Sequence, residues 1–426
     1  MPSPLTDPPT ATEPGVHPPR LESRAEAKRL DATDPLAGLR ERFHLPEPDL
    51  IYLDGNSLGR LPLATRGRIA QVVDQEWGAG LVRSWEHWLD EGQRIGDRLA
   101  QHVLGARPGE VTVGDNTTVN LYKLAAAALD HRPDRPVVIT DRDNFPTDRY
   151  VLQGLAEARG GQLELLDSDI DQGLDLEHLR SALARHHGRV ALVSLSLVSY
   201  RSGALLDLTA VNDLVHQAGA LVLWDLSHAA GAVRIDLTGT GTDLAVGCTY
   251  KYLCAGPGAP AYLYVRRELQ KQLVQPIHGW YGQRDQFAMG ERYQPQPDIR
   301  RFLTGTPSMV AMAGIEPALD LVAVAGIDRL QAKSRALTAA LADLVARRLS
   351  PLGVRIASPL AAERRGGHLT VEHPDAAALH RVLLSEAGVL ADLREPSRLR
   401  FAPTALYNRF VEVWDTVERF EKLLRG

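Results

Sequence analysis

The chain has 426 residues, of which 44% are hydrophobic and 24% charged, and its formal net charge is −5. These values are typical of a soluble globular protein and exclude a collagen-like or wholly disordered chain. At about 150 residues per domain, this length predicts two or three domains. Because no block of lysine or arginine stands out, we expect no nucleic-acid partner.

Cysteine content and hydropathy indicate where the protein works. Cys248 and Cys254 are the only cysteines, too few to cross-link a secreted scaffold, so we expect a reducing, cytoplasmic environment. No stretch approaches the ~18 apolar residues of a membrane helix. The N-terminus also lacks the basic-then-apolar layout of a signal peptide. We therefore expect neither membrane insertion nor secretion.

The N-terminal part of the chain is proline-rich. Residues 1–20 contain seven prolines and almost no large apolar side chains, which is typical of disorder. We place the boundary of this tail at residue 30, although apolar spacing within residues 21–43 favours a helix. Residues 51–53 then predict a short strand that runs into a glycine-flanked polar loop at 54–59. We assign residues 31–60 to a segment that contributes to a smaller domain.

The middle of the chain alternates between apolar runs and helical stretches. Helical patterns at residues 119–129 and 206–218 are interleaved with short apolar runs at 137–139, 190–195, 221–224 and 261–265. Near-continuous apolar strands separated by helices are typical of a mainly parallel sheet covered on both faces. The pattern predicts an α/β fold, with a large domain over residues 61–306.

After Pro307 the pattern changes. A long Ala/Leu-rich helical stretch runs to about residue 348, and helices are predicted at 376–387 and 409–424. Strand-like pieces occupy residues 354–357, 368–371 and 399–401. We therefore predict a smaller α+β domain over residues 307–426.

Two polar residues follow buried strands in the large domain. Asp225 ends the apolar run at 221–224, where open α/β sheets place ligand-binding groups. Lys251 follows a second apolar run and precedes a Gly/Pro turn. A buried lysine is a nucleophile for Schiff-base chemistry, and an aspartate beside it can pair with a pyridinium nitrogen. This pair is what pyridoxal phosphate requires, although a strand-end aspartate that only caps a helix is the plainer alternative for Asp225.

A candidate phosphate-binding segment lies upstream. Residues 114–120 (GDNTTVN) place small hydroxylated residues at the start of a helix, where free backbone N–H groups can hold an anion. An ordinary helix N-cap would use the same residue types. Alone, this segment does not distinguish the two.

Seven segments of the chain are distinctive motifs: YLDGNSLG at 52–59, NFPTDR at 144–149, WDLSHAAG at 224–231, YKY at 250–252, GWYG at 279–282, FLTGTP at 302–307 and RFAPTALYN at 400–408. In these motifs and their order, the chain resembles kynureninase, a pyridoxal-phosphate enzyme of fold type I, the aspartate-aminotransferase-like fold, and resembles its bacterial type. The resemblance extends from about residue 34 to the C-terminus and implies a seven-stranded, mainly parallel sheet in the large domain.

The resemblance implies a role for each matching residue. Lys251 would carry the cofactor's Schiff base, and Asp225 would pair with the ring nitrogen. The other residues implied to bind the cofactor are Thr117, Thr118, Phe145, Asp148, Ser196, His228 and Tyr250. Trp280 and Thr306 would complete the phosphate site from the second subunit of a homodimer with shared active sites. Tyr250 would also take part in proton transfer.

The substrate side is implied in the same way. Arg400 would hold the substrate α-carboxylate, Asn56 and Ser57 would line the pocket, and Trp85, Gly305 and Thr306 resemble the residues of the bacterial type around the aryl ring. The implied reaction cleaves L-kynurenine to anthranilate and L-alanine in tryptophan catabolism and the kynurenine pathway that leads toward NAD biosynthesis. A hydroxyl on the ring changes the preference of an apolar pocket by only ~10²-fold, so 3-hydroxykynurenine is an expected poorer substrate.

Plainer alternatives remain for several of these residues. Phe145, Trp280 and Tyr250 could be core aromatics, and Arg400 could pair with Asp392 or Glu395. Residues 55–59 match a G-x-S-x-G nucleophile elbow, but this segment precedes any strong strand. No metal-binding motif occurs. Another fold type I aminotransferase or β-lyase is the alternative function, whereas a cysteine desulfurase would need a cysteine after Cys254, and none follows.

Overall fold

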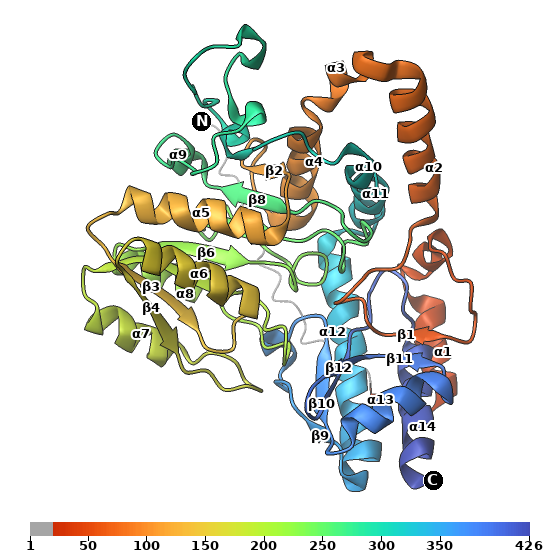
Figure 1. Ribbon diagram of the computed structural model, residues 1–426. Coiled ribbons are helices and arrows are strands. Elements are labelled where there is room, and N and C mark those ends of the chain that lie inside the picture. Colours follow the sequence, from red (N-terminus) through yellow and green to blue (C-terminus); the bar gives the residue numbers. More distant parts are fainter. Residues whose placement is uncertain (1–19) are drawn as a thin grey trace, which may run out of the picture.

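The computed structural model describes residues 20–426 (Figure 1). The predicted tail therefore falls mostly on residues 1–19, which lie outside the described residues. Helix α1, Arg24–Thr33, begins inside the segment assigned to that tail. Its Ser23 side chain accepts the Glu26 N–H at 3.2 Å, and Leu21 and Ala27 are buried. The tail boundary at residue 30 was wrong, because apolar burial and an N-cap already order the chain from residue 23 onward.

A seven-stranded sheet forms the centre of the large unit, as predicted. The five strands β7, β6, β5, β3 and β4 are parallel, and β8 pairs antiparallel with both β7 and β2. In spatial order the strands are β2 (Val111–Val113), β8 (Tyr262–Val265), β7 (Leu244–Gly247), β6 (Leu221–Asp225), β5 (Val190–Ser196), β3 (Val137–Asp141) and β4 (Gln162–Leu166).

Helices cover both faces of this sheet (Figure 1). Side chains of α5 and α6 pack with one face in one apolar cluster, and those of α7 and α8 pack with the other face in a second cluster. Burial on both faces explains why the central strands are apolar at nearly every position. The helices of this unit are α2 (Leu63–Gln71), α3 (Trp85–Trp88), α4 (Glu91–Leu99), α5 (Thr117–His131), α6 (Pro146–Ala158), α7 (Leu176–Arg185), α8 (Leu208–Gln217), α9 (Arg267–Gln270), α10 (Met309–Met312) and α11 (Ile315–Ala325).

The small unit combines both ends of the described chain. Strand β1 (Ile51–Tyr52) pairs in parallel with β11 (Val389–Leu390), and α1 packs on α14. A separate antiparallel sheet has the order β12 (Asp392–Arg394), β13 (Arg398–Phe401), β10 (Leu369–Glu372) and β9 (Arg355–Ile356). The remaining helices of the small unit are α12 (Ile327–Leu344), α13 (Ala376–Ser385) and α14 (Phe410–Arg425).

The boundary between the units falls within α12 rather than at residue 307. Met312 and Ile315 belong to the apolar core of the large unit, whereas Leu337 belongs to the core of the small unit. The predicted continuous helical stretch is interrupted at Gly326, whose φ of +76° lies in a region that favours glycine. Among the described residues no single helix is long and apolar enough to span a membrane, while the bent pair 309–325 and Ile327–Leu352 would by length and composition alone.

Candidate functional site

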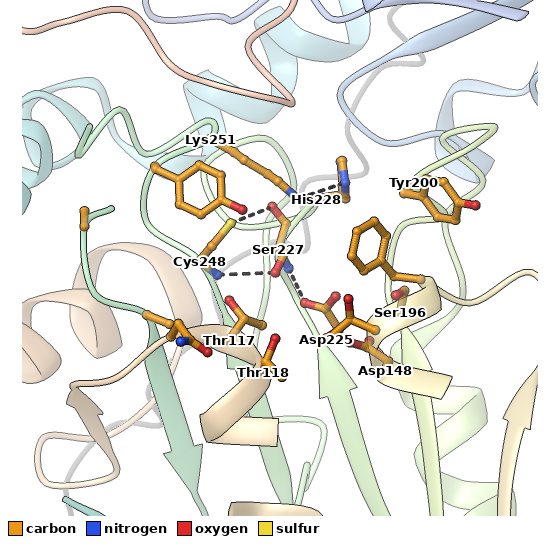
Figure 2. Close-up of a pocket in the computed structure, with 16 residues that line it drawn as sticks. Thr117, Thr118, Asp148, Ser196, Tyr200, Asp225, Ser227, His228, Cys248 and Lys251 are labelled. Atoms are coloured by element: carbon orange, nitrogen blue, oxygen red, sulfur yellow. Dashed lines mark hydrogen bonds between the residues drawn. The ribbon is translucent and has the colours of Figure 1, made fainter. Parts of the chain in front are cut away.

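A cavity opens at the carboxyl ends of the parallel strands, where open α/β sheets place their ligands. Asp225 ends β6, Ser196 ends β5, and Lys251 follows β7. Figure 2 shows these side chains converging on one space. The residues that line it are Asn116, Thr117, Thr118, Phe145, Thr147, Asp148, Ser196, Tyr200, Asp225, Ser227, His228, Cys248, Tyr250, Lys251, Ala259 and Ala261.

Lys251 and His228 are in direct contact in this cavity. The Lys251 Nζ atom lies 3.0 Å from His228 Nε2. Burial, reinforced by the positive charge of Lys251, holds the pKa of His228 well below its usual value. A neutral imidazole has a lone pair with which it can accept a hydrogen bond from the lysine. His228 therefore orients the Lys251 amine without adding a second positive charge.

Two carboxyl groups lie on the far side of the cavity from Lys251. Asp225 accepts the Ser227 N–H at 2.8 Å. Burial, and then the negative charge of Asp225, raise the pKa of Asp148 well above its usual value. The Oδ2 atom of Asp148 is buried and has no hydrogen-bond partner among the described residues. This shift favours the protonated form of Asp148, in which its carboxyl group can donate a hydrogen bond within the cavity.

The N-terminus of α5 forms the wall that the sequence predicted as an anion site. The Asn116 side chain accepts the Val119 N–H at 3.0 Å, so the N-cap interpretation is correct. Thr117 and Thr118 open the helix and line the cavity. A 15-residue helix that directs its first N–H groups at a cavity favours an anionic group there. The N-cap and the candidate anion site therefore lie in the same segment.

An aromatic pair borders the cavity. The rings of Phe145 and Tyr200 meet edge to face, with their centroids 5.3 Å apart. Phe145 is partly exposed, as expected of a side chain that can stack on a planar ligand rather than one buried in the core. Sequence reasoning missed Tyr200, although it follows β5 in the same way that Lys251 follows β7. It also missed Thr147, Ser227 and Cys248, which line the cavity as well.

Arg400 is fully buried next to this cavity rather than in its lining. Its Nε atom donates to Asp392 Oδ2 at 2.6 Å and its Nη1 atom to the Tyr200 carbonyl at 2.5 Å. The alternative pairing with Asp392 is thus present. The third nitrogen, Nη2, lies 3.3 Å from Ser57 Oγ, the serine of the elbow-like segment.

Asn56 lies in the same polar loop as Ser57. Its side chain is fully buried, and neither its amide nitrogen nor its amide oxygen has a partner among the described residues. Unpaired buried amide atoms are costly unless a ligand satisfies them. This environment fits the predicted position of Asn56 on the substrate side.

Four predicted site residues lie away from the cavity of their own chain. Trp85 packs on Trp88, and the exposed Trp280 packs on Phe287, with ring centroids 5.2 Å and 5.8 Å apart. Gly305 and Thr306 are exposed and line a neighbouring cavity together with Asp115 and Asn116. Within one subunit, the structure does not bring these four residues to Lys251.

The residues of the cavity fit pyridoxal phosphate. They combine an amine, a carboxylate, an aromatic face and a helix N-terminus, which match the aldehyde, ring nitrogen, ring face and phosphate of that cofactor. The unpartnered Asp148 Oδ2 further indicates that a polar ligand completes the site. Among residues 20–426, no cluster of three or more His, Cys, Asp or Glu side chains could hold a metal ion.

Related proteins match nearly the whole chain. A kynureninase of Burkholderia pseudomallei (strain K96243) is 44% identical over 414 residues, which cover 95% of this chain and 96% of the relative. A kynureninase of Pseudomonas fluorescens is 42% identical over the same shares. Residues 330–420 match the model of the kynureninase C-terminal domain.

Solved structures with the same fold are more distant in sequence. A cysteine desulfurase from Thermococcus onnurineus NA1 superimposes with a TM-score of 0.79 at 18% identity, covering 91% of this chain and 98% of the other. A C-DES mutant with glycine covalently linked to its PLP cofactor superimposes with a TM-score of 0.76 at 18% identity, covering 90% and 98%. These likenesses confirm the fold alone.

Proposed function

Because this chain belongs to the kynureninase family, we propose that it hydrolyses L-kynurenine to anthranilate and L-alanine with pyridoxal phosphate as cofactor. The observation that carries the proposal is the meeting of Lys251, His228 and Asp225 in one cavity of a chain that matches kynureninases along 95% of its length. The fold neighbours include cysteine desulfurases, but this chain has no cysteine after Cys254 to accept sulfur.

We assign cofactor binding to the lining of this cavity. Asp225 would pair with the ring nitrogen, Phe145 would stack on the ring, and Asp148 would donate a hydrogen bond at the ring edge. The start of α5 would hold the phosphate, with Thr117, Thr118, Ser196 and Tyr250 as its other partners. When bound, the cofactor supplies an electron-withdrawing ring that stabilises negative charge developing on the substrate carbons.

The chain's own groups then bind the substrate and move protons. Lys251 takes the proton from the substrate α-carbon, and His228 keeps the amine oriented through the 3.0 Å contact. Burial raises the pKa of Tyr250 to about 12, so its phenol remains protonated near neutral pH and can donate a proton to the leaving fragment. Arg400 binds the α-carboxylate, with Asn56 and Ser57 beside it. Water supplies the hydroxyl that cleavage adds to the aryl product.

We also propose a homodimer in which each subunit completes the other's site. Trp280 and Thr306 would reach the phosphate of the partner, and Trp85 and Gly305 its aryl pocket. Exposed apolar side chains near these residues give a second copy a surface to bury: Trp77 is 61% exposed, Val82 75% and Phe287 67%. Trp85, Gly305 and Thr306 resemble the residues of the bacterial type, which favours L-kynurenine over its 3-hydroxylated form. We place the enzyme in the cytoplasm, in tryptophan breakdown and the kynurenine pathway toward NAD.

A turnover assay on the cofactor-loaded protein tests this proposal. We expect anthranilate, followed by its fluorescence, and alanine in equal amounts from L-kynurenine, with slower turnover of 3-hydroxykynurenine. Lys251→Ala should abolish turnover and the visible absorption of the bound cofactor, whereas Lys271→Ala, an exposed lysine on the same unit, should change neither. Cofactor absorption with no anthranilate from the unaltered protein would contradict the substrate and favour an aminotransferase or β-lyase.

A further inference from the structure

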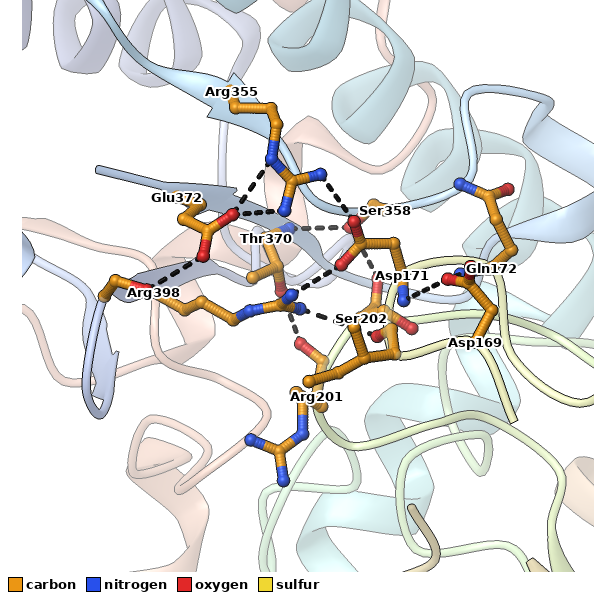
Figure 3. Close-up of polar contacts among 12 residues, drawn as sticks. Asp169, Asp171, Gln172, Arg201, Ser202, Arg355, Ser358, Thr370, Glu372 and Arg398 are labelled. Atoms are coloured by element: carbon orange, nitrogen blue, oxygen red, sulfur yellow. Dashed lines mark hydrogen bonds and ion pairs between the residues drawn. The ribbon is translucent and has the colours of Figure 1, made fainter. Parts of the chain in front are cut away.

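Ion pairs join the two units beside the candidate site (Figure 3). Asp171 lies in the large unit, in the loop between β4 and α7. It accepts from Arg398 of β13 at 2.6 Å and from Arg355 of β9 at 2.5 Å. Arg398 also reaches towards the Ile170 carbonyl at 3.5 Å. One carboxylate thus holds two strands of the small sheet against the large unit.

The loop that carries Asp171 is held in one conformation. The Asp169 carboxylate accepts the N–H groups of Asp171 and Gln172 at 2.8 and 2.9 Å. The backbones of Asp169 and Gly173 exchange two hydrogen bonds, and Gly173 has a φ of +83°. A Cβ at this glycine would lie 2.9 Å from the Cβ of Ala204. The loop therefore presents Asp171 as a fixed anchor rather than as a flexible surface carboxylate.

The pair that Asp171 makes is connected to Arg400 through β13. Arg398 and Arg400 are two residues apart on this strand, so their side chains leave the same face of the sheet. The side chain of Arg398 is only 6% exposed and that of Asp171 17%, which shields their interaction from solvent. Any displacement of β13 at Arg398 would move Arg400 with it.

We call the ion pairs of Asp171 with Arg398 and Arg355 the joint between the two units. Neutral hydrogen bonds extend this joint towards the cavity. Thr370, which is in register with Arg400, donates to the Arg201 carbonyl at 2.7 Å, and Ser358 donates to the Ser202 carbonyl at 2.5 Å. Tyr200, which precedes Arg201 in the chain, lines the cavity, and its carbonyl accepts a hydrogen bond from Arg400. The joint therefore continues without a break from Asp171 to the cavity wall.

From this geometry we propose that Asp171 is a positioning residue for substrate binding. It fixes the small sheet through Arg398 and Arg355 so that Arg400 keeps its place for an α-carboxylate. The inference rests on the proposed function, in which Arg400 binds that carboxylate. It assigns Asp171 no contact with the substrate or the cofactor.

The test compares Asp171→Asn with Asp167→Asn in the loaded enzyme. Asn keeps the shape of Asp171 but removes its charge, so we expect KM for L-kynurenine to rise roughly tenfold while kcat changes by less than about twofold. Asp167 pairs with Arg142 outside the joint and is 80% exposed, so its variant should keep the KM of the unaltered enzyme. Cofactor absorption should be the same in all three proteins.

A competitor that lacks the α-carboxylate separates positioning from general destabilisation. The unaltered enzyme should prefer the carboxylated ligand to the corresponding amine, and Asp171→Asn should lose roughly tenfold of that preference while binding the amine equally well. Equal loss of both ligands, or an unchanged KM, would overturn the inference. If Asp171→Asn does not fold, Arg355→Gln serves as the second variant. The Arg355 side chain is 53% exposed, so its loss should raise KM only about twofold. An unchanged KM in this variant would overturn the inference. An unaltered enzyme that makes no anthranilate refutes the proposed function instead.

Discussion

Asp54 illustrates how the environment of one residue sets its chemistry. It lies in the polar loop that carries Asn56 and Ser57, and its Oδ1 atom is buried with no hydrogen-bond partner among the described residues. Burial raises the pKa of Asp54 to about 6, an effect that the hydrogen bond from Ser57 partly opposes. The folded protein thus holds a proton at pH values where the unfolded chain has already released it.

The first prediction concerns the stability contributed by that proton. The contribution is fully present below the ordinary aspartate pKa of 3.8 and is lost as pH rises through about 6. Asp54→Asn cannot titrate, so its stability relative to the unaltered protein should increase by up to about 2 kcal/mol between pH 4 and 7. Urea unfolding at the two pH values measures this difference. The exposed Asp49→Asn should show no such trend, and a parallel pH dependence for Asp54→Asn and the unaltered protein would contradict the prediction.

At the same scale, the sequence identifies the residues whose type and strand position are both distinctive. Asp225 and Lys251 follow buried strands, and the structure brings them to one cavity. The sequence could not identify Tyr200 in the same way, because a tyrosine four residues after a strand has many ordinary uses. Nor could it choose between a substrate and Asp392 as the partner of Arg400, because that choice depends on how β12 and β13 pair.

Helix N-caps with similar side chains serve different purposes in different elements. Asn116 caps α5 at the cavity, and Asp207 caps α8 through the Ala210 N–H at 3.0 Å, away from the cavity lining. Each cap should stabilise the protein by about 1 kcal/mol. Only the first also orders a helix end that is proposed to hold a phosphate.

The second prediction separates those two purposes. Asn116→Ala and Asp207→Ala should lower the free energy of unfolding of the cofactor-free protein by similar amounts, about 1 kcal/mol each. Only Asn116→Ala should also weaken cofactor binding, by several-fold, because the first turn of α5 loses its fixed geometry. A titration of the cofactor followed by absorbance measures the affinity. Equal affinities for the two variants would mean that the cap of α5 does not serve the cofactor.

Elements with a strong periodic pattern could be predicted from the sequence. The apolar runs at 190–195 and 221–224 correspond to β5 and β6 almost residue for residue. Strand β4, at the edge of the sheet, was missed because its partly exposed residues (QLELL) lack a continuous apolar pattern. The break at Gly326 was also missed, because one glycine within an Ala/Leu-rich stretch is compatible with a continuous helix.

At the scale of the whole molecule, the third prediction tests shared active sites. Lys251→Ala and Trp280→Ala should each be nearly inactive, the first through its own cavity and the second through the partner's. Dissociating and reassociating an equal mixture should restore about a quarter of the unaltered activity, because half of the dimers then contain one intact site of two. Turnover of L-kynurenine measures this recovery, and size-exclusion chromatography confirms reassociation. An inactive mixture of confirmed heterodimers would contradict sharing.

The division of the chain into units could be predicted only in part. The amino-acid composition indicated a change of sequence pattern near Pro307, but the apolar faces of α10 and α11 pack into the large unit. Which core an amphipathic helix joins depends on the tertiary arrangement and not on its own pattern. The same limit applies to the joint at Asp171, since Asp171 and its two charged partners, Arg355 and Arg398, are separated by up to 227 residues in the chain.

The small unit, which draws on both ends of the described chain, also constrains the order of events during synthesis. Residues 51–52 find their strand partner only when residues 389–390 have been made. Domains that emerge first from the ribosome generally fold first. The large sheet can therefore assemble while α1 and β1, although already synthesised, still lack the partners that they pack on in the small unit. Closing that long loop makes the small unit the high-contact-order, late-folding part of the molecule. The half of the site that is proposed to bind the substrate is thus assembled last, after the half that is proposed to hold the cofactor.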